Sequence, residues 1–183
     1  AFVIGVGRNS DRCQKTHIEI LKEVPGSKIH FITADLSTQK EVSKLAASVA
    51  SLLKQNMFTG LDVLVNNAGL FMDKLVMTED GIETTIAVDH IAPFLLTYLL
   101  MPLLSKSADA RIITVSSESH ARTFIVPERI RRPALFISLW QYKLSKLGNI
   151  LFTYEFNARR KNAGPHAFAV DPGLVNTDIG HKG

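Results

Sequence analysis

A tyrosine and a lysine four positions apart are the strongest chemical signal in the chain. They stand in the run Tyr142-Lys143-Leu144-Ser145-Lys146, near the start of a predicted helix, and residues i and i+4 of a helix share one face. A phenol has a reference pKa of about 10, and a neighbouring ammonium lowers that pKa because it favours the phenolate. This spacing predicts a general acid/base, although two surface residues show it equally well by chance.

A serine pair, Ser116 and Ser117, directly follows a predicted strand upstream of that tyrosine. A serine hydroxyl at a strand end can hydrogen-bond a carbonyl oxygen and hold it toward the phenol. The alternative is a polar residue that only caps the strand. Taken together with Tyr142 and Lys146, the pair predicts a site that handles a carbonyl or alcohol oxygen.

Turn-forming residues follow three other predicted strands. The first turn is Asp35-Leu36, where the aspartate could instead cap the next helix. In the second, Asn66-Asn67-Ala68-Gly69, Asn and Gly allow a sharp turn and a close backbone approach to a ligand. The third runs from Asp171 to Thr177, where Pro and Gly shape a loop and the Thr177 hydroxyl can contact an amide or phosphate. An ordinary turn explains each of them separately.

The elements that must position these residues alternate between strand and helix. Short apolar runs predict strands over 1–7, 28–34, 61–65, 111–115 and 167–170, and spaced apolar residues predict helices over 10–24, 38–55, 79–104 and 140–160. Such alternation implies right-handed crossovers. The prediction is a single α/β domain over residues 1–183, a doubly wound, Rossmann-type parallel sheet with helices on both faces. Ligands bind beyond the carboxyl ends of such strands.

Two other features of the sequence are weaker indicators of function. Gly5 and Gly7 imitate the start of a dinucleotide fingerprint, but the third glycine is replaced by Ser10, so we interpret them as the end of a strand. Residues 119–138 are irregular and carry four arginines. A solvated surface loop and a substrate-facing loop both fit this segment.

Composition excludes several classes of protein. The chain has 183 residues, 46% hydrophobic and 21% charged, and 21 basic against 17 acidic residues give a net charge of +4. This is globular composition, and the spread of the basic residues predicts no nucleic acid partner. Cys13, the single cysteine, indicates an intracellular compartment, most simply the cytoplasm. Cys13 and His17 are too few ligands for a metal site, so no metal is expected.

A membrane span is not expected from the apolar run 91–104, which is short and contains Pro93 and Pro102. The chain begins with Ala1, and an anchor upstream of it would attach the protein to a membrane.

In their order, the motifs resemble the short-chain dehydrogenase/reductase family, most closely its retinol-dehydrogenase and carbonyl-reductase type. The resemblance runs from Ala1 to about residue 179. It rests on Asp35-Leu36, Asn66-Asn67-Ala68-Gly69, Val115-Ser116-Ser117, Tyr142-x-x-x-Lys146 and Pro172-Gly173-x-Val175-x-Thr177.

The resemblance implies an oxidoreductase that interconverts a carbonyl and an alcohol by hydride transfer with a nicotinamide cofactor. Tyr142 would donate or accept the proton, and Ser117 would hold the substrate oxygen. Lys146 would lower the pKa of Tyr142 and bind the nicotinamide ribose. Asp89 stands where the family usually has an asparagine, and it is a fourth catalytic candidate that could instead weaken the proton relay.

The same resemblance implies the remaining cofactor contacts. Asn67, with Ala68 and Gly69, would lie at the adenosine ribose, Asp35 and Leu36 at the adenine, and Val175 and Thr177 beside the nicotinamide, in the loop that Pro172 and Gly173 shape. Arg8 follows the family's second strand. An arginine there favours a 2′-phosphate, so NADP is expected rather than NAD.

The family's glycine-rich pyrophosphate loop has no counterpart here, which predicts a fold incomplete at both ends and weak cofactor binding by these residues alone. An alternative is therefore a non-catalytic nucleotide-binding or regulatory protein of the same fold. A fragment that does not fold alone is a further alternative, because a missing central strand exposes sheet edges. The expected substrate is small and lipophilic, such as a retinoid, steroid or lipid aldehyde, and the helices around 91–104 and Tyr142 would form a homodimer contact.

Overall fold

The computed structural model describes residues 1–127, 130–160, 164–173 and 175. The elements run in the order β1 (Phe2–Gly7), α1 (Ser10–Glu23), β2 (Lys28–Thr33), α2 (Gln39–Gln55), β3 (Val63–Asn66), α3 (Thr84–Ile86), a π-helical turn (Ala87–Ile91), α4 (Ala92–Leu104), β4 (Arg111–Val115), a 3₁₀ turn (Glu118–His120), α5 (Ser138–Arg159) and β5 (His166–Val170). All five predicted strands are present within a few residues of their expected bounds.

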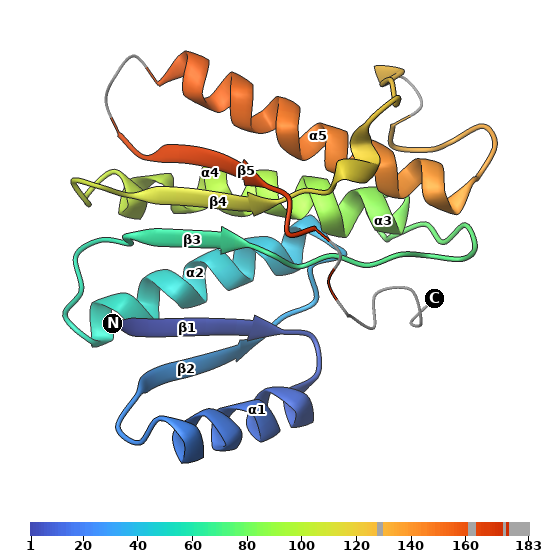
Figure 1. Cartoon of the computed structure of the whole chain (residues 1–183). Coiled ribbons are helices and arrows are strands. Elements are labelled where there is room, and N and C mark those ends of the chain that lie inside the picture. Colours follow the sequence, from blue (N-terminus) through green and yellow to red (C-terminus); the bar gives the residue numbers. More distant parts are fainter. Residues whose placement is uncertain (128–129, 161–163, 174, 176–183) are drawn as a thin grey trace.

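The strands are parallel throughout, which confirms the predicted α/β class. However, they form two sheets rather than one. Among the described residues β1 pairs only with β2, while β3, β4 and β5 form a three-stranded sheet in that order. Figure 1 shows all the strand arrows pointing the same way. The carboxyl ends of both sheets therefore lie toward the same side of the molecule.

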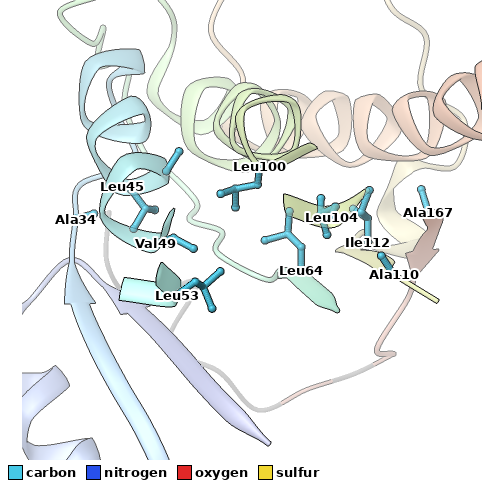
Figure 2. Packing of buried hydrophobic residues seen from close by; sticks show 11 residues of the cluster. Ala34, Leu45, Val49, Leu53, Leu64, Leu100, Leu104, Ala110, Ile112 and Ala167 are labelled. Atoms are coloured by element: carbon cyan, nitrogen blue, oxygen red, sulfur yellow. The ribbon is translucent and has the colours of Figure 1, made fainter. Parts of the chain in front are cut away.

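One hydrophobic cluster joins the two sheets. Helix α2 contributes Leu45, Val49 and Leu53, and the three-stranded sheet contributes Leu64 and Ile112. Figure 2 shows these side chains between the helices and the strands. Phe2, Ile4 and Ile32 from β1 and β2 pack against the same cluster. The apolar stripe of α2 therefore covers both sheets, and this helix begins where Thr38 accepts a hydrogen bond from the Glu41 amide at 3.3 Å.

The helix predicted from residue 79 begins only at Thr84. A turn occupies the preceding residues, where the Thr78 amide donates to the Ile82 carbonyl at 2.9 Å and Gly81 has a φ of +67°. The buried Glu83 carboxylate then accepts hydrogen bonds from the Thr85 and Ile86 amides at 2.9 and 3.1 Å. This capping satisfies the first free amides of the helix, which fixes the start of the helix at this point.

The apolar run 91–104 belongs to a longer apolar helical region. Thr84–Leu104 is a continuous run of 21 residues with a mean hydropathy of 1.6, which is long and apolar enough to span a membrane. Its length therefore does not exclude a span, contrary to the expectation from residues 91–104. In this fold 44% of its apolar window is buried, and α4 packs against α2.

The two glycines of β1 make room for side chains. A Cβ on Gly5 would lie 2.6 Å from the Phe31 ring, and one on Gly7 would lie 2.6 Å from Cys13 Sγ. Their interpretation as strand residues is confirmed. These two glycines therefore allow β1 to pack closely against β2 and α1.

Candidate active site

Helix α5 places Tyr142 and Lys146 side by side, as their spacing predicted. The Lys146 Nζ lies 5.1 Å from the centroid of the Tyr142 ring. The ring of Phe71 packs against the ring of Tyr142, and the two ring centroids lie 5.9 Å apart. Tyr142 is half-buried.

The two serines after β4 do different things. Ser116 is buried, and its hydroxyl donates to the Lys146 carbonyl at 2.9 Å, which ties the strand end to α5. Ser117 is half-buried and accepts a hydrogen bond from the Ser119 amide at 3.2 Å, and its side chain opposes the rise in the pKa of the nearby Tyr142 phenol. The second serine is therefore the one that adjoins the phenol, and its role toward the substrate oxygen stays a prediction.

Lys146 is almost fully buried, with 3% of its side chain exposed. Its Nζ donates to the Val115 carbonyl at 3.4 Å and lies 3.5 Å from Oδ2 of Asp89, whose side chain is 0% exposed. The Asp89 carboxylate also accepts a hydrogen bond from the Leu70 amide at 2.8 Å. The structure thus brings all four predicted catalytic residues together: Ser117, Tyr142, Lys146 and Asp89.

Burial dominates the electrostatics of this group. It raises the pKa of Asp89 from its usual 3.8 to about 7, although the Lys146 ammonium and the Leu70 amide act in the opposite direction. Desolvation disfavours the charged form of a carboxyl group. The aspartate therefore titrates near neutral pH.

The prediction that Lys146 lowers the pKa of Tyr142 is not met in this structure. Burial raises the pKa of Tyr142, the charge of Asp89 raises it further, and the hydrogen bond with Ser117 only partly opposes these effects. The main physical reason is burial of the phenol, and the Asp89 carboxylate close to Lys146 adds to it. A paired ammonium exerts little net field on the phenol, because the field of Asp89 offsets it.

The predicted cofactor residues divide between the two sheets. The loop Asn67–Gly69 after β3 is exposed and adjoins the catalytic group. A Cβ on Gly69 would lie 3.4 Å from Lys146 Nζ and 3.5 Å from Asp89 Oδ2. These are ordinary contact distances, so the backbone at Gly69 lies directly beside the lysine and the aspartate.

Arg8 and Asp35 follow β1 and β2, at the carboxyl edge of the two-stranded sheet, and both are exposed. The Asp35 carboxylate accepts a hydrogen bond from the Ser37 amide at 3.0 Å, so it also shapes the turn before α2. Leu36 is half-buried and packs against the core cluster. Their assignment to adenine and ribose stays a prediction.

In the loop after β5, Pro172, Gly173 and Val175 are exposed. The Gly173 amide donates to the Asp171 carboxylate at 3.0 Å, and Gly173 has a φ of +70°, a conformation that favours glycine. Thr177 lies outside the described residues, and its predicted contact stays a prediction.

Sequence reasoning missed Asn149 and His90. The Asn149 amide group donates to the Asp89 carbonyl at 2.9 Å, and its oxygen lies 3.0 Å from His90 Nδ1. Burial lowers the pKa of His90. Asn149 follows Lys146 by three positions on α5, so helical periodicity could have revealed it. Among the described residues, no three His, Cys, Asp or Glu side chains converge as a metal site would require.

A sequence model described as short chain dehydrogenase matches residues 1–182. The chain belongs to the short-chain dehydrogenase family. Retinol dehydrogenase 12 of Mus musculus is 36% identical over 161 residues, which cover 88% of this chain and 49% of that protein. The WW domain-containing oxidoreductase of Gallus gallus is 35% identical over 181 residues, 94% of this chain and 42% of that protein. This chain thus spans about half the length of these relatives of the family.

Solved structures of the family share the fold. An uncharacterized protein from Mycobacterium Paratuberculosis matches with a TM-score of 0.78 and 30% identity, over 99% of this chain and 62% of that one. NADPH-bound carbonyl reductase from chicken fatty liver matches with a TM-score of 0.69 and 24% identity, over 98% and 71% of the two chains. The second likeness concerns the fold alone. Members of the family are oxidoreductases that use a nicotinamide cofactor.

Proposed function

We propose that this chain carries the catalytic centre of an NADP-dependent oxidoreductase that interconverts a carbonyl and an alcohol. The observation that supports it is the convergence of Ser117, Tyr142 and Lys146 at the carboxyl edge of the three-stranded sheet. In the reductive direction the Tyr142 hydroxyl donates a proton to the substrate oxygen. In the oxidative direction the Tyr142 phenolate accepts it.

Each side chain has a separate task in that reaction. Ser117 donates a hydrogen bond to the substrate oxygen and holds it against the phenol. Lys146, whose Nζ lies beside Gly69, binds the nicotinamide ribose. Phe71 packs on Tyr142 and shields it from water on that side. When bound, the nicotinamide cofactor supplies or accepts the hydride.

NADP is proposed over NAD because Arg8 is exposed directly after β1. A guanidinium forms paired, charge-assisted hydrogen bonds with a phosphate. NADP is named as the bound molecule of similar folds, including an alcohol dehydrogenase from Thermococcus sibiricus with a bound 5-hydroxy-NADP. Asn67, Ala68, Asp35 and Leu36 are proposed for the adenosine portion.

The proposed substrate is lipophilic. The irregular segment before α5 presents exposed apolar side chains near the site, among them Phe124, which packs edge-on against Trp140 with ring centroids 5.2 Å apart. A second copy of the chain is proposed to cover α4 and α5, where Tyr98 and Tyr154 are exposed. The proposed location is intracellular, at the cytoplasm or on a membrane facing it.

The decisive test is Tyr142→Phe in the complete protein. Turnover of a carbonyl panel with NADPH should fall by about a thousandfold, since general acid/base catalysis contributes roughly 10²–10⁴-fold, while circular dichroism stays unchanged. Tyr154→Phe is the matched control, because Tyr154 lies on the same helix with its side chain exposed. Retained turnover in Tyr142→Phe rules the assignment out.

The second candidate is a non-catalytic nucleotide-binding or regulatory protein of the same fold. The pairing of Lys146 with Asp89 favours it, because a phenol whose pKa is raised is a weaker acid and is more rarely present as the phenolate near neutral pH. Cofactor binding by the complete protein, without turnover of any carbonyl or alcohol in the panel, would favour this second hypothesis over the enzyme.

A further inference from the structure

A buried carboxylate stands directly behind the tyrosine and lysine of the site. Asp89 lies in the π-helical turn Ala87–Ile91 between α3 and α4. A π-turn carries one more residue per turn than the flanking α-helix, and such turns are frequent at functional sites. The turn directs the Asp89 side chain toward α5, where Lys146 lies.

Contacts on several sides hold this aspartate. The Leu70 amide donates to its Oδ1 at 2.8 Å, and the Asn149 side chain donates to its main-chain carbonyl at 2.9 Å. The Ser145 hydroxyl lies 3.5 Å from its Oδ2. The carboxylate therefore has a fixed place between the loop after β3 and α5, and it cannot turn away from Lys146.

The charged and titratable groups around it are few. Lys146 lies 3.5 Å from Oδ2. Glu83 acts on Asp89 from the start of α3, Asp89 acts in turn on Tyr142, and His90 is its sequence neighbour with a ring tied to Asn149. Asp171 faces Tyr142 from the loop after β5. Among the described neighbours Lys146 is the one lysine or arginine, so a second such charge does not restore the field that Asp89 removes.

We infer that Asp89 is a positioning residue for the proposed reaction: its carboxylate holds the Lys146 ammonium beside Tyr142 and offsets that ammonium's charge, so that the pair sets the acidity of the phenol. This inference rests on the proposed function for its catalytic meaning. The contacts that support it involve only residues that the structure describes. It differs from an asparagine at the same place, which would hold the lysine without offsetting its charge.

A pH dependence follows from this arrangement. The pKa of Asp89 lies at about 7 because of burial. Below that pH the carboxyl group is neutral, Lys146 keeps an unopposed charge, and ionisation of Tyr142 becomes easier. Above it the carboxylate offsets the lysine, and ionisation of the phenol becomes harder.

The test is a titration of the Tyr142 phenol in the complete protein, with and without Asp89→Asn. Asparagine keeps an oxygen that can accept from the Leu70 amide but carries no charge. The phenolate absorbance of each protein is corrected by subtracting that of the same protein with Tyr142→Phe. We expect the ionisation midpoint to fall by about one pH unit or more in Asp89→Asn, since an unopposed neighbouring cation lowers a pKa by roughly 1–3 units.

Glu83→Gln is the matched control, because Glu83 is also a fully buried carboxylate but caps a helix instead of facing the phenol. Its midpoint should move much less than that of Asp89→Asn, even if the fold is weakened. The comparison uses the pH range in which circular dichroism shows every protein folded. An equal ionised fraction with and without the Asp89 carboxylate at each pH, or an equal shift in Glu83→Gln, overturns the inference.

The phenol titration needs no turnover, so its result separates two failures. A lowered midpoint in a protein that reduces no carbonyl leaves the role of Asp89 intact and removes the proposed function. Where turnover is measured, the oxidative limb of the pH profile of kcat/KM should move to lower pH by the same amount in Asp89→Asn. A merely structural role would lower kcat without moving that limb.

Discussion

The three-stranded half of the molecule and the two-stranded half bury very different shares of their side chains. In β4, Ile112 is 0% exposed, whereas in β1 Val3 and Val6 are 49% and 42% exposed. Helix α2 buries five residues against the core, and α1 buries Cys13 alone. The half that carries Ser117, Tyr142 and Lys146 is thus well packed, while the half that carries Arg8 is held mainly through α2. The proposed catalytic side chains therefore lie in the better-packed half of the molecule.

The largest expected effect concerns the buried carboxyl group in the three-stranded half. The pKa of Asp89 is raised from 3.8 to about 7 in the folded protein, so between these values the folded state binds a proton that the unfolded state has lost. This contribution to stability is fully present below about pH 4 and is lost as pH rises through about 7. We expect the free energy of unfolding, relative to Asp89→Asn, to fall by up to about 4 kcal/mol over that range.

Urea unfolding of both proteins at several pH values measures this difference. In the two-stranded half, Asp35→Asn serves as the control, because Asp35 is exposed. Its stability relative to the unchanged protein should show no comparable loss between pH 4 and about 7. If the free energy of unfolding relative to Asp89→Asn rose with pH instead, this would contradict a pKa of Asp89 that is raised in the folded protein.

Removal of an apolar side chain should separate the two halves next. Ile112→Ala leaves a cavity in the shared core and should cost about 3 kcal/mol of unfolding free energy. Val3→Ala removes a half-exposed side chain and should cost less than about 1 kcal/mol. Thermal and urea unfolding give both values. Equal costs would show that β1 is buried as deeply as β4 in solution.

Much of the secondary structure could be predicted from sequence, because strands and helices depend on local patterns. The valine- and isoleucine-rich runs located all five strands, and the apolar stripe of α2 located that helix. The start of the next helix was placed too early at residue 79. The turn closed by Gly81 and the side-chain cap from Glu83 depend on local geometry that periodicity does not report.

The site was predictable as a set of residues but not as an electrostatic unit. Ser117, Tyr142 and Lys146 follow from strand ends and helical spacing. The contact of Asp89 with Lys146 joins residues far apart in sequence through a π-helical turn, and the hydrophobic pattern does not reveal such a turn. The raised pKa of Tyr142 depends on burial and on that contact. The split into two sheets could not be predicted either, because an apolar run does not show which other strand it pairs with.

A smaller effect is expected when the exposed half loses its predicted phosphate contact. In the complete protein, Arg8→Ala should weaken NADPH binding by about tenfold, since a hydrogen bond to a charged group contributes about 1.5–3 kcal/mol. NADH affinity should change little. Isothermal titration with the two cofactors measures both. Equal losses for NADPH and NADH would show that Arg8 does not meet the 2′-phosphate, while Arg12→Ala on the exposed face of α1 controls for loss of charge alone.

The smallest expected effects come from the two helix caps, one in each half. Thr38 accepts from the Glu41 amide and caps α2, whereas Asn9 accepts from the Arg12 amide at 2.8 Å and caps α1. Loss of such a cap costs about 1 kcal/mol when the helix unfolds together with the whole protein. Because α1 buries only Cys13, we expect it to open on its own before global unfolding.

Thr38→Ala should therefore lower the global unfolding free energy by about 1 kcal/mol, and Asn9→Ala by only a few tenths. Amide hydrogen exchange distinguishes the causes. In Asn9→Ala, exchange should quicken in α1 alone, while β4 keeps its protection. If both caps lower the global free energy equally and exchange quickens everywhere, the two halves unfold as one unit, and the weak packing of β1 and α1 has no separate consequence for stability.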